Sequence, residues 1–159
     1  MFHEVITHMH PIVVHFPIVL IIFATLYDLF FAIFKREPAP KGNWIWFVAF
    51  LSAWIAVGTG PGENARGNTN LFKYHDKLAN LTTILTFLNV AYRVFFMVKR
   101  KKVVRQWLAI NCILSVLCTI GILSVGYYGG KMVYDQGIGV KVHGKFVNPP
   151  KQGHSEDHD

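Results

Sequence analysis

The sequence from Pro11 to Phe34 reads PIVVHFPIVLIIFATLYDLFFAIF, and within it Asp28 is the one Asp, Glu, Lys or Arg. A helix needs about 20 mostly apolar residues to cross the roughly 30 Å hydrocarbon layer of a bilayer. This segment has that length, and Lys35-Arg36 follows it directly as a polar anchor. The segment is therefore predicted to be a transmembrane helix.

Three further apolar segments follow, at about residues 44–61, 74–98 and 106–128. The chain of 159 residues is 52% hydrophobic and 16% charged, whereas soluble domains carry about 25% charged residues. We therefore predict an all-α integral membrane protein, with one up-down-up-down four-helix bundle over residues 1–142. The polar segment 143–159 is expected to be an extended or loosely ordered external tail.

Basic residues gather in two short loops, 35–43 and 99–105, which together hold half of the chain's 16 lysines and arginines. Short loops rich in Lys and Arg stay in the cytoplasm, so both termini are predicted on the outer side of a bacterial inner membrane. Trp44, Trp46 and Trp107 lie beside these loops and are expected in an interfacial aromatic belt. The net charge of +7 follows from this topology and from contact with anionic lipid, and it requires no nucleic-acid partner.

Two histidines fall at matching depths in different spans. His15 lies about one turn inside the first span, just before Pro17, which removes a backbone donor and is expected to bend the helix. His75 opens the third span. Imidazole is a common axial ligand of haem iron, so this pair suits a b-type haem, with His10 as a further candidate ligand. The alternative is that backbone carbonyls or water satisfy both rings.

The motif His-Pro-x-x-Val-His-Phe-Pro at residues 10–17, the histidine at 75 and Gly-Gly-Lys-Met-Val-Tyr at 129–134 resemble a bacterial family of predicted membrane proteins. This family is domain of unknown function 2231, and the resemblance covers about residues 9–140. It implies four helices, with His10, His15 and His75 as the motif histidines. Some relatives are fused to Rieske iron–sulfur or cytochrome c domains, which implies redox work at the outer face. Relatives often carry Gly-x-x-Asp in the second loop, where this chain has Glu63, so the role of that acid is open.

Further residues are candidates for contact with a haem near the outer face. Arg66, Lys73 and Lys77 are expected to hold its propionates. Gly129-Gly130 are expected just past the end of the fourth span, where they let the chain turn back so that Tyr134 covers the site. A simple helix cap followed by a turn is an equally good interpretation.

Asp28 and Arg93 form a second constellation. Asp28 lies six residues before the end of the first span, and Arg93 lies five before the end of the third, so their depths agree. Opposite charges inside a membrane are normally paired, so we expect a structural ion pair, with a proton path as the alternative. Arg93 reaching the interface by snorkelling is a third interpretation. Amide side chains in the spans are expected to hydrogen-bond between helices: Asn80, Asn89 and Asn111.

The resulting hypothesis is a membrane electron-transfer protein that binds a b-type haem and passes electrons between quinol and an external redox protein of cytochrome c or Rieske type. The first alternative is a transition-metal-binding or transport protein for a metal such as zinc or copper, supplied by His143, His154 and His158. The second is a structural anchor subunit of a larger membrane complex. An enzyme that converts a substrate has the least support, because no nucleophile–base pair or phosphate-binding loop is visible.

Overall fold

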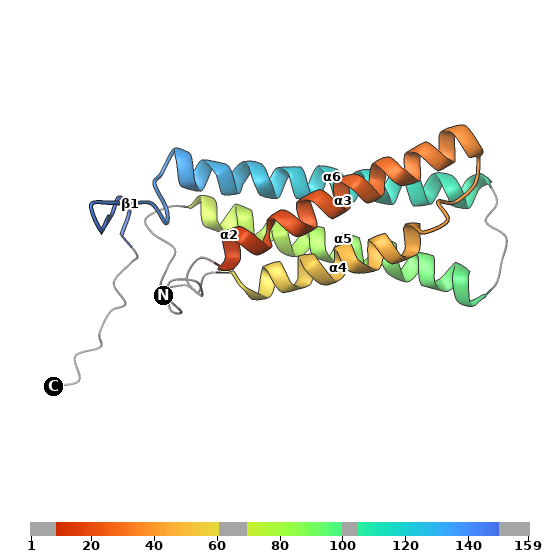
Figure 1. The fold of residues 1–159 in the computed structure, drawn as a ribbon, viewed down its shortest axis with the longest axis horizontal. Helices are drawn as coiled ribbons and strands as arrows, with labels where there is room; N and C mark the ends of the chain where they lie inside the picture. The colour runs from red at the N-terminus through yellow and green to blue at the C-terminus, as the bar shows by residue number, and fades with distance from the viewer. Residues whose placement is uncertain (1–8, 61–69, 100–104, 150–159) are drawn as a thin grey trace.

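The computed structural model describes residues 9–60, 70–99 and 105–149. Three helical runs in it are long and apolar enough to cross a membrane, His10–Lys35, Leu71–Val98 and Arg105–Tyr134, and a shorter apolar helix lies between the first two. The prediction of a mostly helical chain with four helices is thus confirmed. The elements in chain order are α2 (Met9–Val13), α3 (His15–Phe30), the π-helical segment η1 (Phe31–Lys35), α4 (Gly42–Gly58), α5 (Leu71–Val98) and α6 (Arg105–Tyr134) (Figure 1).

The first run is interrupted at Val14, between α2 and α3. Pro17 lies one turn later and has no N–H to donate to the carbonyl of Val13, and its ring crowds that carbonyl. The break separates His10 on α2 from His15 on α3.

Each long helix packs against two others. α3 contacts α4 and α6, and α5 contacts the same two helices, so α3 and α5 lie diagonally across the bundle (Figure 1). The α-carbons of α3 and α5 come no closer than 8 Å. Any direct link between these two helices must therefore be made by side chains.

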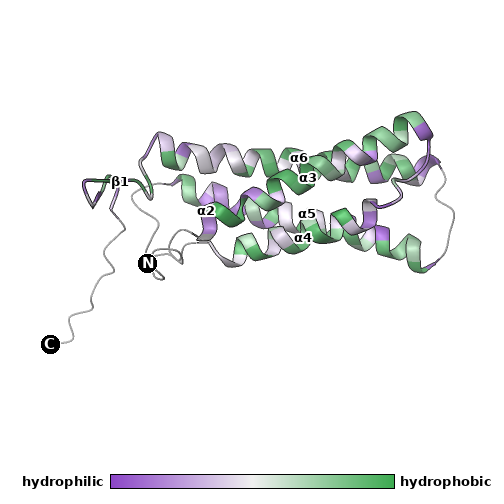
Figure 2. Ribbon diagram, viewed as in Figure 1, coloured by the Kyte–Doolittle hydropathy of each residue, from purple (hydrophilic) through white to green (hydrophobic). Residues whose placement is uncertain are grey.

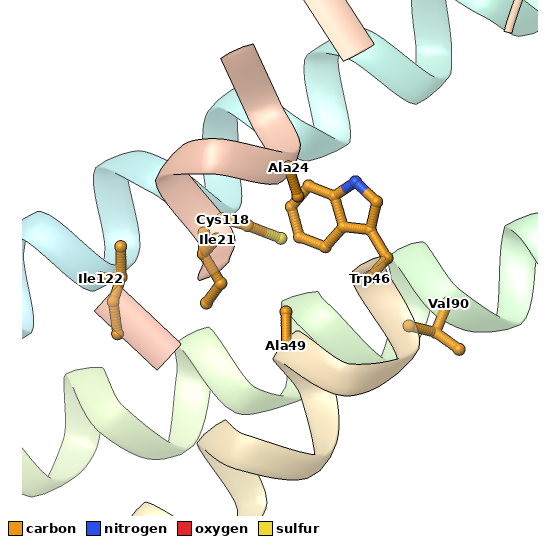
Figure 3. Packing of buried hydrophobic residues seen from close by; sticks show 7 residues of the cluster. All are labelled: Ile21, Ala24, Trp46, Ala49, Val90, Cys118 and Ile122. Carbon is orange, nitrogen blue, oxygen red and sulfur yellow. The ribbon is translucent and has the colours of Figure 1, made fainter. Parts of the chain in front are cut away.

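The apolar core lies between the helices, about midway along them. Trp46 from α4 is fully buried and packs with Ile21 and Ala24 of α3 and Cys118 of α6 (Figure 3). The prediction that Trp46 belongs to an interfacial belt is therefore wrong. Trp44, two residues earlier, is 72% exposed, so for this residue the interfacial position stays a prediction. The interior holds Trp46 because its indole N–H donates to the buried carboxylate of Asp28.

The outward faces of the helices are apolar. Figure 2 shows hydrophobic residues along the length of the bundle and hydrophilic ones mainly towards its ends. Large side chains such as Phe34 and Ile33 are 70% and 65% exposed. Exposed apolar surface of this extent is unusual for a soluble monomer and is what lipid covers in a membrane protein.

α6 extends six residues beyond the predicted end of the fourth span, to Tyr134. The prediction that Gly129-Gly130 lie past a helix end and turn the chain back is therefore wrong. Both glycines lie inside α6, where a glycine lets a neighbouring side chain approach closely. The turn comes later, at Gly137, which has a positive φ of 62°.

A small β-hairpin follows α6. β1 (Lys141–Val142) pairs antiparallel with β2 (Lys145–Phe146). His143 and Gly144 form its two-residue turn with φ of 49° and 78°, the signature of a type I′ turn. The segment from residue 143 was expected to be extended or loosely ordered, and its first four residues form the turn and the second strand of this hairpin.

Candidate functional site

His10 lies at the end of the bundle where α4 ends. Its Nδ1 is 3.1 Å from the carbonyl oxygen of Ala56 and 3.5 Å from Oγ1 of Thr59. The last four carbonyls of a helix have no partner within the helix, and Ala56 belongs to the last turn of α4. His10 thus uses an acceptor that the end of α4 leaves available.

His75 lies in the second turn of α5, at the same end of the bundle. Its Nδ1 is 3.1 Å from the carbonyl oxygen of Val125 in α6. Its ring packs on Gly129: a Cβ added there would lie 3.4 Å from Cε1 of His75. Gly129 therefore lies beside the imidazole, and a Cβ at this position would be in ordinary van der Waals contact with the ring.

Both rings have the same hydrogen-bonding arrangement. A carbonyl oxygen can only accept, so Nδ1 of His10 and of His75 must carry the hydrogen. In the neutral ring Nε2 then keeps its lone pair, and no hydrogen bond from a described residue reaches Nε2 of either ring. Both rings lie at the same end of the bundle, His10 beside the end of α4 and His75 in the second turn of α5. We call His10 and His75 the histidine pair.

His15 is placed differently. It is exposed, and its Nδ1 lies 2.6 Å from the carbonyl oxygen of Pro11, one turn earlier in the same run. The interpretation that a backbone carbonyl satisfies the ring therefore describes His15. Of the predicted set, His10 and His75 each hydrogen-bond to a neighbouring helix, whereas His15 bonds within its own run.

The remaining predicted contacts are spread over the surface. Lys73 and Lys77 are exposed on the first turns of α5, and Tyr134 is 89% exposed at the end of α6. His143 is exposed in the hairpin turn. Several predicted residues lie outside the described part of the chain: Glu63, Arg66, His154 and His158. Over the ranges that are described, no group of three or more His, Cys, Asp or Glu side chains is arranged to hold a metal ion.

The predicted pairing of Asp28 with Arg93 is confirmed. Arg93 Nη2 donates to Asp28 Oδ2, and the two side chains are 5% and 1% exposed. Asp28 Oδ2 also accepts from Nε1 of Trp46 at 2.7 Å and from Oγ of Ser115 at 2.9 Å. One side chain from each of α3, α4, α5 and α6 thus belongs to the buried ion pair or hydrogen-bonds to it. A buried charge needs such partners, because water does not solvate it in a low-dielectric interior.

Two partners of this ion pair escaped the sequence reasoning. Trp46 follows a basic loop and was therefore predicted at the interface. Its ring instead lies beside the guanidinium of Arg93, whose Cζ is 5.3 Å from the ring centre. Ser115 drew no attention, because single serines are common in membrane helices. The signal that identifies both is depth. Trp46 is the fifth residue of α4 and Ser115 follows the start of α6 by ten residues, so both come near the level of Asp28.

The amide side chains are used less between helices than predicted. Asn80 donates to the carbonyl of Asp76 in its own helix, at 2.9 Å, so its predicted interhelical bond is wrong. Asn89 accepts from Nε of Arg93, also in α5, at 3.1 Å. Among the described residues, the buried atoms Asn89 Nδ2, Asn111 Oδ1 and Asp28 Oδ1 have no hydrogen-bond partner. Bound water is the usual partner of such atoms in a protein interior.

Comparison with known proteins gives one match. A family model described as predicted membrane protein (DUF2231) matches residues 7–142, which include all the described helices and both members of the histidine pair. No curated protein and no solved structure matches the chain. The match confirms the resemblance that the motifs at residues 10–17 and 129–134 predicted.

Proposed function

Because the chain belongs to the DUF2231 family of predicted membrane proteins, we propose that it spans a bacterial inner membrane as an up-down-up-down bundle with both termini outside. The support is the position of the basic residues. Those in the described part of the two inner loops all lie at the end opposite the histidine pair: Lys35, Arg36, Lys41, Lys99 and Arg105. Lysine and arginine in short loops favour the cytoplasmic side. The histidine pair then lies near the outer face.

The proposed function is electron transfer by a b-type haem, whose iron His10 and His75 would hold through their imidazoles. The observation that supports it is the shared arrangement of the two rings. Each donates Nδ1–H to a backbone carbonyl, which fixes the tautomer and leaves Nε2 with its lone pair. Metal-ligating histidines almost always have such a partner on the other ring nitrogen, because it orients the ring and increases its basicity.

The number of ligands favours haem over a bare metal ion. A structural zinc site uses four protein ligands, and a catalytic one uses three. Within the described ranges the candidate site offers two histidines and no third His, Cys, Asp or Glu in a suitable position. Haem needs at most two protein ligands, because its macrocycle supplies the other four.

A bound haem would supply one-electron redox chemistry, and this chain supplies ligation and a low-dielectric setting. The exposed Lys73 and Lys77 remain candidates for holding the propionates at the water boundary, with Arg66 and Tyr134 as further candidates. The electrons would come from quinol in the membrane and pass to an external cytochrome c or Rieske-type protein.

The decisive test is the absorption spectrum of the detergent-purified protein, oxidised and then reduced with dithionite. We expect sharp low-spin bands in the wild type, lost in both His10→Ala and His75→Ala because each removes an axial ligand. His15→Ala and His154→Ala are the matched controls and should keep the bands. If His15→Ala loses the bands and His10→Ala keeps them, the ligand pair is His15 and His75. Protein that never carries haem but retains zinc or copper would overturn the proposal in favour of metal handling.

A further inference from the structure

A shallow groove runs along the outward face of α6, near the histidine pair. It is lined by Ile120, Leu123, Ser124, Tyr127 and Tyr128 and has a volume of about 350 Å³. The residues recur at helical spacing, so they lie along one face of one helix. In a membrane this face is open to lipid, so the groove admits ligands that dissolve in the bilayer.

The groove and the histidine pair share one turn of α6. Val125, whose carbonyl accepts the hydrogen bond from His75, lies between Ser124 and Tyr127 in the sequence. Tyr128, at one end of the groove, stacks on Tyr74 with ring centres 6.0 Å apart, and Tyr74 directly precedes His75. A ligand in the groove would therefore lie on the opposite side of this turn from His75.

The polarity of the groove changes along its length. Ile120 and Leu123 are purely apolar and lie towards the middle of α6. Towards the histidine pair come the hydroxyl of Ser124 and the two aromatic rings with phenol groups, Tyr127 and Tyr128. An occupant with a hydrocarbon tail and a flat polar ring at one end matches this order.

We propose that this groove binds the ring and the first isoprenoid units of a membrane quinol. The proposal deepens the proposed function, on which it rests, by assigning the site of the electron donor. Tyr127 and Tyr128 meet edge to face with ring centres 5.5 Å apart, and Tyr128 offers a flat surface for a second ring. Ser124 Oγ donates its hydrogen to the carbonyl of Ile120 at 2.8 Å, so the oxygen keeps its lone pairs for a quinol hydroxyl.

The size of the groove fits this occupant. Small-molecule sites usually have volumes of about 300–1,000 Å³, and this groove lies at the lower end of that range. It can hold a ring and a short length of tail, while the rest of a long isoprenoid chain remains in lipid.

The test is photolabelling of the full-length protein in phosphatidylcholine nanodiscs with an azido-quinone. We expect the label in the peptide that contains residues 120–128, and we expect excess decylubiquinone to compete it away. Ile120→Trp fills the groove and should lower labelling about tenfold, which corresponds to about 1.4 kcal/mol. Ile113→Trp is the matched control, because Ile113 lies two turns away on α6 and is 58% exposed against 56% for Ile120. This control should label like the wild type.

Two results would overturn the assignment. The first is that Ile120→Trp and Ile113→Trp change the labelling by the same factor. The other is equal competition by decanol, which lacks the ring and would show that the groove holds any alkyl chain. The haem spectrum is measured separately on the same samples. Specific labelling without a haem spectrum would support the quinone site and refute the electron-transfer role. A haem spectrum without labelling would refute the quinone site alone.

Discussion

Replacing Asp28 with Asn removes the negative charge that faces Arg93 in the core and leaves the shape of the side chain almost unchanged. The asparagine oxygen can still accept from Trp46 and Ser115, so the main loss is the counter-charge. The Arg93 side chain is 5% exposed, so water cannot take over that role. Removing one partner of a buried ion pair costs about 3–5 kcal/mol. We therefore expect Asp28→Asn to lower the free energy of unfolding by about this amount.

The assay is reversible unfolding of the purified protein in mixed micelles, followed by circular dichroism as the fraction of dodecyl sulfate rises. It compares the wild type, Asp28→Asn, Arg93→Gln and the double variant. The double variant leaves no unpaired charge, so its loss should be smaller than the sum of the single losses by about 1–3 kcal/mol.

The control for this cycle is Asp135→Asn. It breaks the exposed contact between Lys131 Nζ and Asp135 Oδ2, 3.9 Å apart, which should be worth less than about 1 kcal/mol. Strict additivity of the two changes at Asp28 and Arg93 would refute the reasoning. Single losses no larger than that of Asp135→Asn would refute it as well.

Two further predictions concern packing and topology. A Cβ added at Gly121 would lie 2.6 Å from Oγ1 of Thr82, so Gly121→Ala should cost about 1–3 kcal/mol by overpacking in the same unfolding assay. Gly126→Ala, on the same helix with nothing within 4 Å of the added Cβ, should be neutral or stabilising by up to about 1 kcal/mol, and equal losses at the two sites would contradict the packing argument. The carboxyl terminus should lie outside the cytoplasm, because the basic loops hold the opposite end of the bundle inside. A reporter enzyme fused after Asp159 should therefore show its activity outside the cytoplasm and none inside. Cytoplasmic activity of that fusion would reverse the proposed orientation.

The helices and the buried ion pair were predictable because both depend on depth along a helix. Apolar length locates a span, and distance from the end of a span places Asp28 and Arg93 at one level. In a membrane interior, two opposite charges at the same level have little alternative to pairing. The same argument extends to Ser115, because the predicted start of the fourth span at about residue 106 is one residue from the start of α6.

The identity of the histidine pair was not predictable because it depends on rotation about the helix. His10 and His15 are five residues apart, which turns their side chains about 140° from each other in a regular helix. Only one of them can then face the bundle, and depth alone does not say which. The break at Val14 changes this rotation further, and its effect is visible only in the packed structure.

Glycine and tryptophan gave misleading signals for a related reason. Gly129-Gly130 are typical of a helix end, yet both lie inside α6, where Gly129 is beside the ring of His75. Trp46 beside a basic loop is typical of an interfacial residue, yet its N–H has a buried carboxylate to bind. The neighbouring side chains, His75 for Gly129 and Asp28 for Trp46, are more than fifteen residues away in sequence. A local sequence pattern therefore does not reveal them.

The two constellations lie on the same diagonal of the bundle, one at each end. α5 has no direct backbone packing with α2 or α3, so only side chains can fix its position relative to them. At one end the long side chain of Arg93 closes this distance and reaches Asp28. At the other end His10 and His75 are held by carbonyls of α4 and α6 and make no hydrogen bond to each other. A ligand that binds both imidazoles would supply the second diagonal link. The ion pair would then link α3 to α5 at the end of the bundle that carries the basic loops, and a haem bound by both imidazoles would link α2 to α5 at the opposite end.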